Sequence, residues 1–421
     1  MPQLARLRVD RFRNARPGID LKFGPTFNVL LGKNATGKST LLDLIAAATN
    51  DDLSPYSEEE GGYDITYWLA KDDREVEVHA ARKRAMLGQE AAERGNEKVY
   101  DDTSTIVLRT ANVETDRFEV SGATGNWLQA DGSKRTFELR LGTSGRRVAL
   151  RALFAVADFG DVHATAGARR IRDALDIIGF WGEVPRFDEA LGTFSAIGQA
   201  QFQLGREGSG GGHGSFGAWL PIEFVRVANE PATGEALVVP FTKLGQLATI
   251  PQLLGFTSAE LRPRLLARSQ DGEKVTSKYL GFDCLFARAD GSKVSYGLLS
   301  FGQKRLFAFL WYLAVRQDRP VVADELLNGL HHEWIRACFD RMEGRQSFLA
   351  TQHPLLLDHI PVTSIEAAET TFIRCSSVVS SNGGEQLDWR NFDHEEAERF
   401  FIAYQTGIQQ VSEVLRSEGL W

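Results

Sequence analysis

The clearest pattern of apolar and polar positions lies near the start of the chain. A short apolar run is formed by Phe27, Val29, Leu30 and Leu31. A second apolar group has helical spacing and contains Leu41, Leu42, Leu44, Ile45 and Ala48. The first run predicts a buried strand, and the second predicts a helix packed on a sheet. We therefore expect a strand, a tight connection and a helix in direct succession.

The connection has the spacing G-x-x-x-x-G-K-[ST] of a phosphate-binding P-loop. Its residues, taken as the nucleotide-binding set together with Thr40, are Gly32, Lys33, Asn34, Ala35, Thr36, Gly37, Lys38 and Ser39. Glycines at both ends let successive N–H groups point at one anion, and the helix that follows adds the positive end of its dipole. We expect Lys38 to contact the β- and γ-phosphates of ATP, and the Ser39 hydroxyl to bind Mg²⁺.

A second apolar pattern follows the pentapeptide Leu299–Gln303. Residues 305–315 are apolar nearly all round, which predicts a buried helix, and Pro320 ends it. Val321–Ala323 then predicts a short strand that places two acidic residues at its carboxyl end, where ligands bind in open α/β sheets. We interpret this pair as a Walker B motif.

The two acidic residues have different expected roles. Asp324 would hold Mg²⁺, and Glu325 would polarise the attacking water. An isolated Asp-Glu pair would be an ordinary surface feature, and its position after the predicted helix favours the catalytic reading. Phe348–Thr351 predicts the next strand, and His353 follows it.

Five segments together resemble ABC-type ATPases of the RecF/SMC/OLD-like branch. They are Phe12–Asn14, the P-loop, Leu299-Ser300-Phe301-Gly302-Gln303 (the L-S-x-G-Q signature form), Asp324-Glu325 with Asn328–His331, and His353. More narrowly, the set is similar to the AAA-labelled ATP-binding proteins of bacterial anti-phage defence operons, such as OLD, Septu and PARIS ATPases. The closing segment Gly407–Trp421 also resembles the ending of this group.

The resemblance implies an ATP-sandwich homodimer or a higher homo-oligomer. Ser300, Gly302 and Gln303 of one subunit would close over ATP held by the P-loop of the other. It also implies catalytic roles for Glu325 and for His353, which would contact the γ-phosphate. A separately encoded effector is expected, because too few residues follow His353 for an appended TOPRIM nuclease. The identity of the effector stays open.

Two other functions compete with this one. A RecF-like DNA-repair ATPase is the first alternative, so DNA remains a possible partner. The ATPase subunit of a membrane transporter is disfavoured, because Asn328–His331 replaces its S-A-L-D loop and the insert before Leu299 is long. The adjacent His331 and His332 have no Cys or carboxylate at ligand spacing, so we read them as interface loop and not as a zinc site.

The middle of the chain begins with β-type patterns. The predicted strands are Tyr63–Leu69, Glu75–Ala80, Thr105–Arg109, Phe118–Val120 and Phe137–Leu141. A helix is predicted over about 169–202, and Gly205–Gly217 is read as a flexible linker with no element of its own. Pro221–Leu266 is read as a lobe that faces a partner. A hairpin is predicted from Tyr279–Phe286 and Lys293–Tyr296.

These patterns give an α/β fold: an ABC-type P-loop ATPase with a mixed central sheet, an antiparallel β lobe and an inserted α-rich lobe. No sustained heptads predict coiled-coil arms. The expected domains are 1–160 with the P-loop and β lobe, 161–275 as the insert, and 276–421 with the signature and Walker B. At the end of the chain, one helix from about His394 to Arg416 is predicted, with Phe400, Tyr404, Ile408, Val411 and Leu415 on one face.

Composition adds limits to the partners. The 421 residues carry a net charge of −8, which argues against a strongly basic nucleic-acid coat but leaves a local basic groove possible. The three cysteines, Cys284, Cys338 and Cys375, are widely spaced and form no C-x-x-C pair, as in a reducing compartment. No leader and no apolar run of membrane-span length is seen, so we expect a cytoplasmic protein.

Overall fold

The computed structural model describes residues 2–57, 59, 61–84, 100–139, 147–157, 166–178, 186–187, 201–206, 212–215, 220–228, 237–272, 274–315, 319–351, 354–380, 383–417 and 419–420. The chain divides into two compact units. The first unit joins Met1–Val184 to Arg345–Trp421, and the second is Pro185–Gly344. The expected domain boundaries after residues 160 and 275 differ from these limits and stay a prediction.

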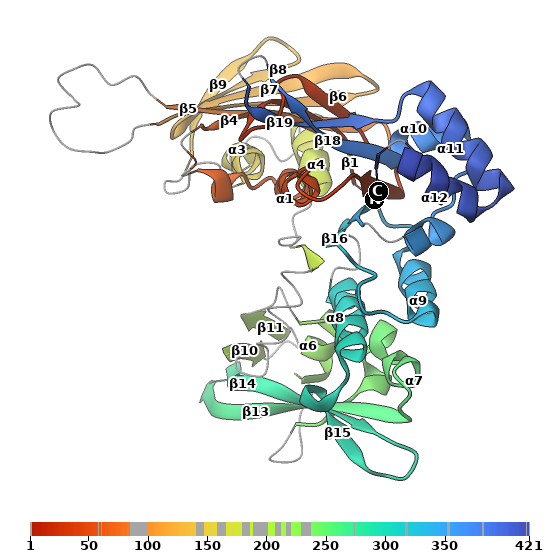
Figure 1. Cartoon of the computed structure of the whole chain (residues 1–421). Helices are drawn as coiled ribbons and strands as arrows, with labels where there is room; N and C mark the ends of the chain where they lie inside the picture. The colour runs from red at the N-terminus through yellow and green to blue at the C-terminus, as the bar shows by residue number, and fades with distance from the viewer. Residues whose placement is uncertain are drawn as a thin grey trace, which may run out of the picture. The chain divides into compact units, whose positions relative to one another are not determined.

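The larger sheet of the first unit is antiparallel throughout and has the order β2-β1-β4-β5-β6-β7-β8-β9 (Figure 1). Its strands are β1 (Gln3–Phe12), β2 (Ile19–Lys22), β4 (Tyr63–Lys71), β5 (Arg74–Arg84), β6 (Tyr100–Thr110), β7 (Val113–Ser121), β8 (Thr124–Gln129) and β9 (Lys134–Glu138). The predicted antiparallel β lobe is therefore confirmed. Strand β8 was not predicted, because Gly125 and Asn126 weaken its β pattern.

Among the described helices, α3 (Val148–Ala157) and α4 (Ala166–Ile178) pack on this sheet. Helix α4 packs against β4 and β5. A buried carboxylate fastens it: Asp116 accepts from Trp127 Nε1 at 3.0 Å and from Arg170 Nε at 2.5 Å. The helix predicted over 169–202 is confirmed as far as Ile178 in α4, and it is wrong at residues 201–202, which begin the strand β10. Residues 179–185 and 188–200 lie outside the described part.

The smaller sheet of the first unit carries the P-loop. In it, β17 (Ser347–Ala350) and β18 (Phe372–Val379) run parallel to β3 (Phe27–Leu31) on either side. Strand β19 (Glu385–Asn391) adds to β18 in the antiparallel direction. The predicted mixed sheet is thus confirmed. Helix α1 (Lys38–Thr49) follows β3, and the 3₁₀ turn η1 (Ser54–Tyr56) comes next.

The end of the chain forms two helices where one was predicted. After the 3₁₀ segment η7 (Pro354–His359) and helix α10 (Ile365–Thr371) come α11 (His394–Thr406) and α12 (Ile408–Ser417), drawn in blue in Figure 1. Gly407 separates the two helices with φ 128° and ψ 148°, a positive-φ conformation that glycine adopts without strain and that ends α11. The expected face is still buried at Phe400 and Leu415.

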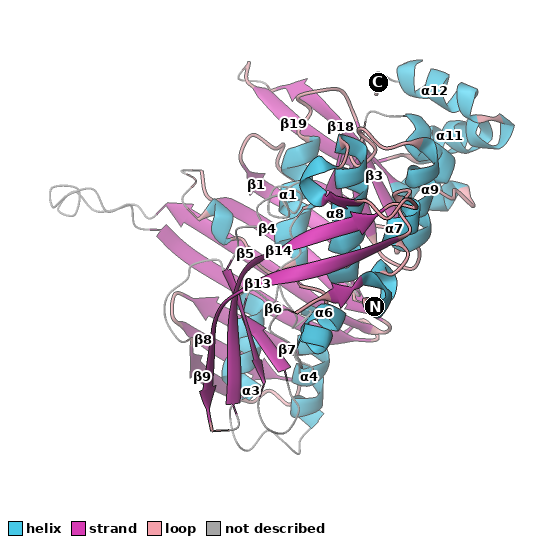
Figure 2. Cartoon of the chain, turned by 90° about the horizontal axis from the view of Figure 1, so that it is seen from below, coloured by secondary structure: helices cyan, strands magenta, loops and turns pink. Residues whose placement is uncertain are grey.

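The second unit is built on a long hairpin, β13 (Ser258–Asp271) with β14 (Lys274–Ala287), whose strands run side by side in Figure 2. Its other strands are β10 (Gln201–Arg206), β11 (Gly212–Ser215), β12 (Val239–Pro240), β15 (Lys293–Ser295) and β16 (Val321–Asp324). Its helical segments are α6 (Ile222–Ala228), η4 (Phe241–Lys243), η5 (Gly245–Leu247), α7 (Ile250–Leu253), η6 (Tyr296–Leu298), α8 (Phe301–Val315) and α9 (His332–Met342).

Two sequence expectations in this unit meet different outcomes. The hairpin ahead of the signature is confirmed, because Phe286 in β14 pairs with Val294 in β15. The glycine-rich linker is wrong in the parts that the structure describes: Gly205 pairs with His213, so β10 and β11 are antiparallel neighbours. Glycines lower strand propensity, but the pairing of β10 with β14 overrides that local weakness. Residues 207–211 and 216–217 lie outside the described part.

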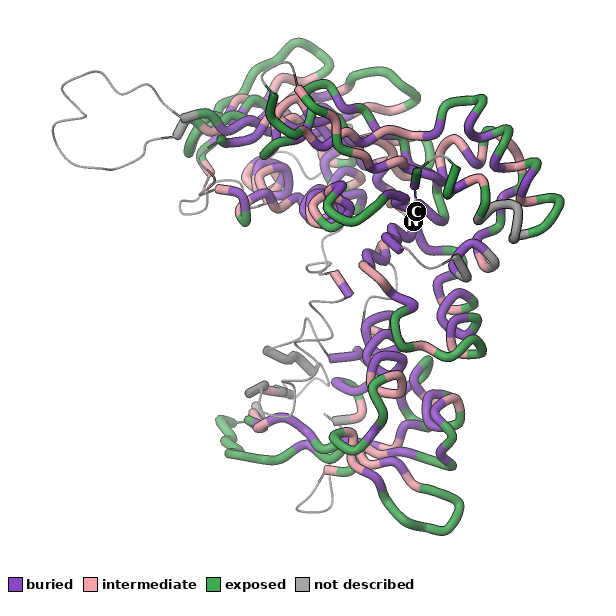
Figure 3. The backbone as a smooth tube through the Cα atoms, viewed as in Figure 1, coloured by how far each residue is buried: buried purple, intermediate pink, exposed green. Residues whose placement is uncertain are grey.

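Helix α8 is the core of the second unit. Ten consecutive residues, Arg305–Ala314, are buried, as predicted from the apolar pattern, and the helix is drawn largely in purple (Figure 3). Phe307 packs edge-on against Phe286 with ring centroids 5.6 Å apart, and Trp311 lies 5.5 Å from Phe282. No described helix exceeds the 15 residues of α8, and none is long and apolar enough to cross a membrane.

Candidate nucleotide-binding site

The P-loop starts at the carboxyl end of a fully buried strand. All five residues of β3 are buried, and parallel neighbours pair with it on both sides, Leu349 and Ile373 opposite Val29 and Leu30. Parallel strands need cover on both faces, which explains why every residue of this strand except Asn28 is apolar. The predicted strand, connection and helix are confirmed.

The two glycines of the loop are required by close approach of other segments. A Cβ on Gly32 would lie 2.2 Å from the main-chain oxygen of Cys375 in β18. A Cβ on Gly37 would lie 2.6 Å from Leu387 in β19, and Gly37 has φ +79°, a conformation that favours glycine. The strands β18 and β19 therefore press against the loop from the side.

The start of α1 is suited to bind an anion. Gly37 is the N-cap residue and supplies no capping side chain, and the first turn contains no acidic residue. The first N–H groups of a helix lack partners within the helix and carry the positive end of its dipole. Phosphate oxygens are the groups that such a terminus binds best.

Lys38 is folded back over the loop. Its Nζ donates to the main-chain oxygens of Gly32 at 2.7 Å and Lys33 at 2.8 Å, and its side chain is buried. Thr36 Oγ1 also donates to the oxygen of Lys33, at 2.8 Å. These hydrogen bonds tie the loop to its own main-chain oxygens. They also place the ammonium group of Lys38 at the centre of the loop. Asn34, Ala35 and Ser39 are exposed on the outside.

One residue that the sequence analysis missed supports the loop from β19. The buried indole Nε1 of Trp389 donates to the main-chain oxygen of Thr36 at 3.2 Å. Burial also raises the pKa of the neighbouring Cys375 thiol to about 12, so this thiol is neutral beside Lys38. No local motif could identify Trp389, because it lies 353 positions along the chain from Thr36.

In the second unit, Asp324 ends β16 and Glu325 follows it in a left-handed conformation with φ 48°. The side chain of Arg305 in α8 holds the main chain of this turn. Its Nη2 donates to the main-chain oxygen of Glu325 at 2.5 Å, and its Nε donates to the main-chain oxygen of Leu326 at 3.1 Å. The carboxylate of Asp324 forms an ion pair of 3.4 Å with Arg186. The predicted strand Val321–Ala323 is confirmed.

The signature residues form a capped helix start. Ser300 N donates to Gln303 Oε1 at 3.0 Å, and Gln303 N donates to Ser300 Oγ at 3.3 Å. This reciprocal pair is a capping box, which explains the Ser-x-x-Gln spacing without reference to any ligand. Gln303 Nε2 also donates to the oxygen of Leu254 at 2.9 Å.

Gly302 sits between the signature and the segment that follows Walker B. A Cβ on Gly302 would lie 2.5 Å from the oxygen of Gly329 and 3.1 Å from Trp334. Trp334 Nε1 in turn donates to the oxygen of Leu253 at 3.0 Å. The predicted interface loop Asn328–His331 therefore lies against the signature turn, with Asn328, Gly329 and His331 exposed.

The predicted site residues fall into two groups. The P-loop with Thr40 belongs to the first unit, and the signature, Asp324 and Glu325 belong to the second. Each group is assembled within its own unit by the contacts above. His353 lies outside the described residues.

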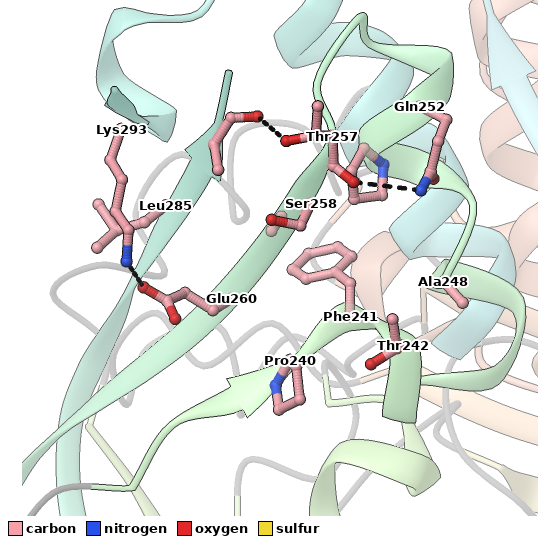
Figure 4. A pocket seen from close by; sticks show the side chains of 13 residues that line it. Pro240, Phe241, Thr242, Ala248, Gln252, Thr257, Ser258, Glu260, Leu285 and Lys293 are labelled. Atoms are coloured by element: carbon pink, nitrogen blue, oxygen red, sulfur yellow. Dashed lines mark hydrogen bonds and ion pairs between the residues drawn. The ribbon is translucent and has the colours of Figure 1, made fainter. Parts of the chain in front are cut away.

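A small pocket of about 150 Å³ lies in the second unit (Figure 4). Pro240, Phe241 and Pro251 give it an apolar wall, and the ion pair of Glu260 with Lys293 at 2.7 Å lies at its edge. The hydrogen bond from Lys293 holds the pKa of Glu260 below its ordinary value. The pocket contains none of the predicted site residues.

Mg²⁺ is the metal that the predicted site implies. Among the described residues, no three His, Cys, Asp or Glu side chains form a cluster that could hold a metal ion. Mg²⁺ commonly takes one or two protein oxygens and completes its shell with substrate phosphates and water. The Asp324 carboxylate and the Ser39 hydroxyl are donors of the required hard-oxygen type.

Comparison with known protein families gives a match for one segment of the chain. Residues 6–146 match an AAA domain. The match includes most of β1, the P-loop, α1 and most of the antiparallel sheet. No curated protein sequence matches this chain.

Several solved structures are similar at low identity. The SMC head domain from Thermotoga maritima is 12% identical with a TM-score of 0.37, and the match covers 93% of this chain and 99% of that one. The Smc head domain with a coiled coil and joint from Pyrococcus yayanosii is 9% identical with a TM-score of 0.37, covering 96% and 100%. An SmcHead bound to the C-winged helix domain of ScpA is 13% identical with a TM-score of 0.34, covering 92% and 98%. These TM-scores are low, and nothing about the assembly or partners of this chain follows from them.

Proposed function

We propose that this protein is a Mg²⁺-dependent ATPase that binds ATP at Gly32–Thr40 and hydrolyses it to ADP and phosphate. The observation that carries the proposal is the start of α1: Gly37 leaves its N-terminus without a side-chain cap, and Lys38 places an ammonium beside it. A strand, a glycine loop and a helix in this order form the common phosphate cradle of P-loop proteins. The AAA-domain match over the same segment supports the assignment.

The remaining roles in the proposal follow from side-chain chemistry. Lys38 leaves its carbonyl partners for the β- and γ-phosphates, whose oxygens carry more negative charge. Mg²⁺ held by Ser39 and Asp324 would supply charge neutralisation at the phosphates. Glu325 orients and polarises the attacking water, and His353 contacts the γ-phosphate. Signature residues Ser300, Gly302 and Gln303 act from a second copy of the chain.

Exposed apolar side chains support the proposed homodimer. Leu298 is 77% exposed and Phe301 is 64% exposed, on either side of Ser300. A surface that another protein covers commonly contains exposed apolar side chains, so these two residues fit the proposed dimer contact. In the proposed ATP-sandwich dimer, this surface faces the nucleotide bound by the other copy. Hydrolysis of that ATP then lets the two copies separate.

The first test is ATP binding by the wild-type protein and by Lys38→Ala. We expect Lys38→Ala to lose ATP binding while keeping its fold. Lys22→Ala, an exposed lysine in β2 of the same unit, is the matched control and should bind ATP as the wild type does. Equal ATP binding by wild type and Lys38→Ala would overturn the assignment of the loop.

The second test is the mass of Glu325→Gln with ATP and Mg²⁺, with Glu333→Gln, an exposed residue of α9, as the control. The glutamine variant should hydrolyse ATP slowly and accumulate as a dimer or larger assembly. Hydrolysis at the wild-type rate would show that Glu325 is not the residue that activates water. A monomer at every ATP concentration would contradict the sandwich dimer.

The biological role that we propose is the sensor of a bacterial anti-phage defence system that controls a separate effector. It rests on the motif set alone, and the product of the neighbouring gene is the candidate effector. Capture of that product by the Glu325→Gln assembly would support the role. The result that favours a RecF-like ATPase is different. In that case the ATP-dependent dimer does not bind the product of the neighbouring gene but binds DNA, with an affinity that falls steeply with salt.

A further inference from the structure

Arg186 lies at the carboxylate proposed to bind Mg²⁺. Its Nη2 donates to Asp324 Oδ2 over 3.4 Å. The two side chains are only 12% and 16% exposed, so the pair is largely shielded from water. Both residues belong to the second unit. No motif in the sequence singled out Arg186.

The position of Arg186 is set by the residue that follows it. Phe187 is fully buried and meets Phe309 of α8 edge-on, with ring centroids 5.0 Å apart at 78°. It also lies 5.9 Å from the ring of Tyr312. A buried ring in such a packed aromatic group is a firm anchor. Helix α8 therefore fixes the main chain beside Arg186.

A second arginine joins the same arrangement. The guanidinium of Arg305 stacks over Phe187 at 5.3 Å and donates to the main-chain oxygens of Glu325 and Leu326. Arg305 thus holds the backbone of the Walker B turn. Because that backbone is held independently, the contact of Arg186 acts on the Asp324 carboxylate itself.

We propose that Arg186 is a positioning residue that neutralises and holds Asp324 until a divalent cation takes the carboxylate, so that it sets the Mg²⁺ concentration needed for nucleotide binding. This inference rests on the proposed function, in which Asp324 is a Mg²⁺ ligand. A largely buried carboxylate without a positive partner is costly, which explains why an arginine is placed there. Strong arginine–carboxylate bonds are about 2.7–2.9 Å long, so a contact of 3.4 Å can be exchanged.

The test measures binding of a fluorescent ATP analogue while Mg²⁺ is titrated, with no turnover involved. Arg186→Ala should lower the Mg²⁺ concentration for half-maximal binding roughly fivefold, as expected for removing one partly shielded competing charge. Arg186→Lys should lie between the wild type and Arg186→Ala. Arg336→Ala, an exposed arginine of α9, should match the wild type.

The same titration in an Asp324→Asn background completes the test. There, removal of Arg186 should leave the Mg²⁺ requirement unchanged, because the carboxylate that the arginine competes for is gone. An unchanged or higher Mg²⁺ requirement in Arg186→Ala, or a lowered one that persists in Asp324→Asn, would overturn the inference. Thermal unfolding of each variant checks that it is folded. If Arg186→Ala does not fold, the Mg²⁺ requirement of Arg186→Lys tests the inference in its place.

Failure of the proposed function can be distinguished from failure of the inference about Arg186. If the wild type binds the analogue no better than Lys38→Ala, the P-loop assignment fails and this inference fails with it. If the wild type binds and Lys38→Ala does not, but Arg186→Ala keeps the wild-type Mg²⁺ requirement, only the role of Arg186 is rejected.

Discussion

The indole Nε1 of Trp389 donates a hydrogen bond of 3.2 Å to the main-chain oxygen of Thr36, so the glycine loop that precedes α1 is supported by the distant strand β19. Together with Leu387 against Gly37, this contact makes β19 one wall of the loop. The geometry of the loop therefore depends on residues far from its own motif.

We predict that Trp389→Phe weakens ATP binding and lowers the free energy of unfolding by about 1 kcal/mol, because the buried oxygen of Thr36 loses its donor. ATP titration and chemical unfolding measure the two effects. Trp68→Phe is the matched control, since it removes a 2.9 Å bond to Glu77 in the larger sheet. The control should change stability without changing ATP affinity, and a similar loss of affinity in both variants would contradict a specific role for Trp389.

Gly32→Ala should abolish ATP binding. Its Cβ would lie 2.2 Å from the main-chain oxygen of Cys375, and a main-chain atom in a paired strand cannot move aside as a side chain can. We expect a loss of about 2 kcal/mol or more in stability from this overpacking. Gly24→Ala, in the segment that precedes β3, is the control, because its nearest neighbour is 3.6 Å away. Tight ATP binding by Gly32→Ala would show that the loop tolerates a wider shape.

Gly302→Ala should disturb the signature turn, because its Cβ would lie 2.5 Å from the oxygen of Gly329. We expect Gly302→Ala to keep ATP binding at the P-loop and to lose ATP-dependent assembly. The mass of the double variant Gly302→Ala, Glu325→Gln with ATP measures the assembly. Gly297→Ala, whose nearest contact is Ser295 Oγ at 3.8 Å, should assemble normally. Normal assembly of Gly302→Ala would separate this turn from the dimer contact.

Asp51 is expected to make stability depend on pH. Burial raises its pKa to about 6 from a reference of 3.8, although the Tyr67 hydroxyl and the Leu150 amide donate to its carboxylate at 2.6 and 2.8 Å. Because the folded state holds the proton more tightly than the unfolded state, the free energy of unfolding should fall as pH rises from about 4 to about 6 and then level off. Two pKa units correspond to about 3 kcal/mol.

The variant Asp51→Asn isolates this effect from other titrating groups. Asparagine is neutral at every pH in the range, so the difference in unfolding free energy between wild type and variant should change between pH 4 and pH 6 and be constant above. Urea unfolding at a series of pH values measures it. A difference that does not vary with pH would contradict the raised pKa.

The sequence by itself determined the parts whose interactions are local. The strand β3, the glycine loop and α1 are contiguous, so apolar spacing and glycine positions were enough to predict them. The buried helix α8 was predicted for the same reason, and its Ser300–Gln303 capping box lies within four residues. Local propensity and local hydrogen bonds are readable along the chain.

The tertiary structure decided what depends on contacts between distant segments. Strands β10 and β11 form within a glycine-rich stretch because β14 supplies a pairing partner, and one predicted terminal helix became two at Gly407. The pairing of Trp389 with Thr36 and of Arg186 with Asp324 joins residues that no spacing rule connects. Such contacts gain their energy from burial and partner geometry that exist only once the chain has folded.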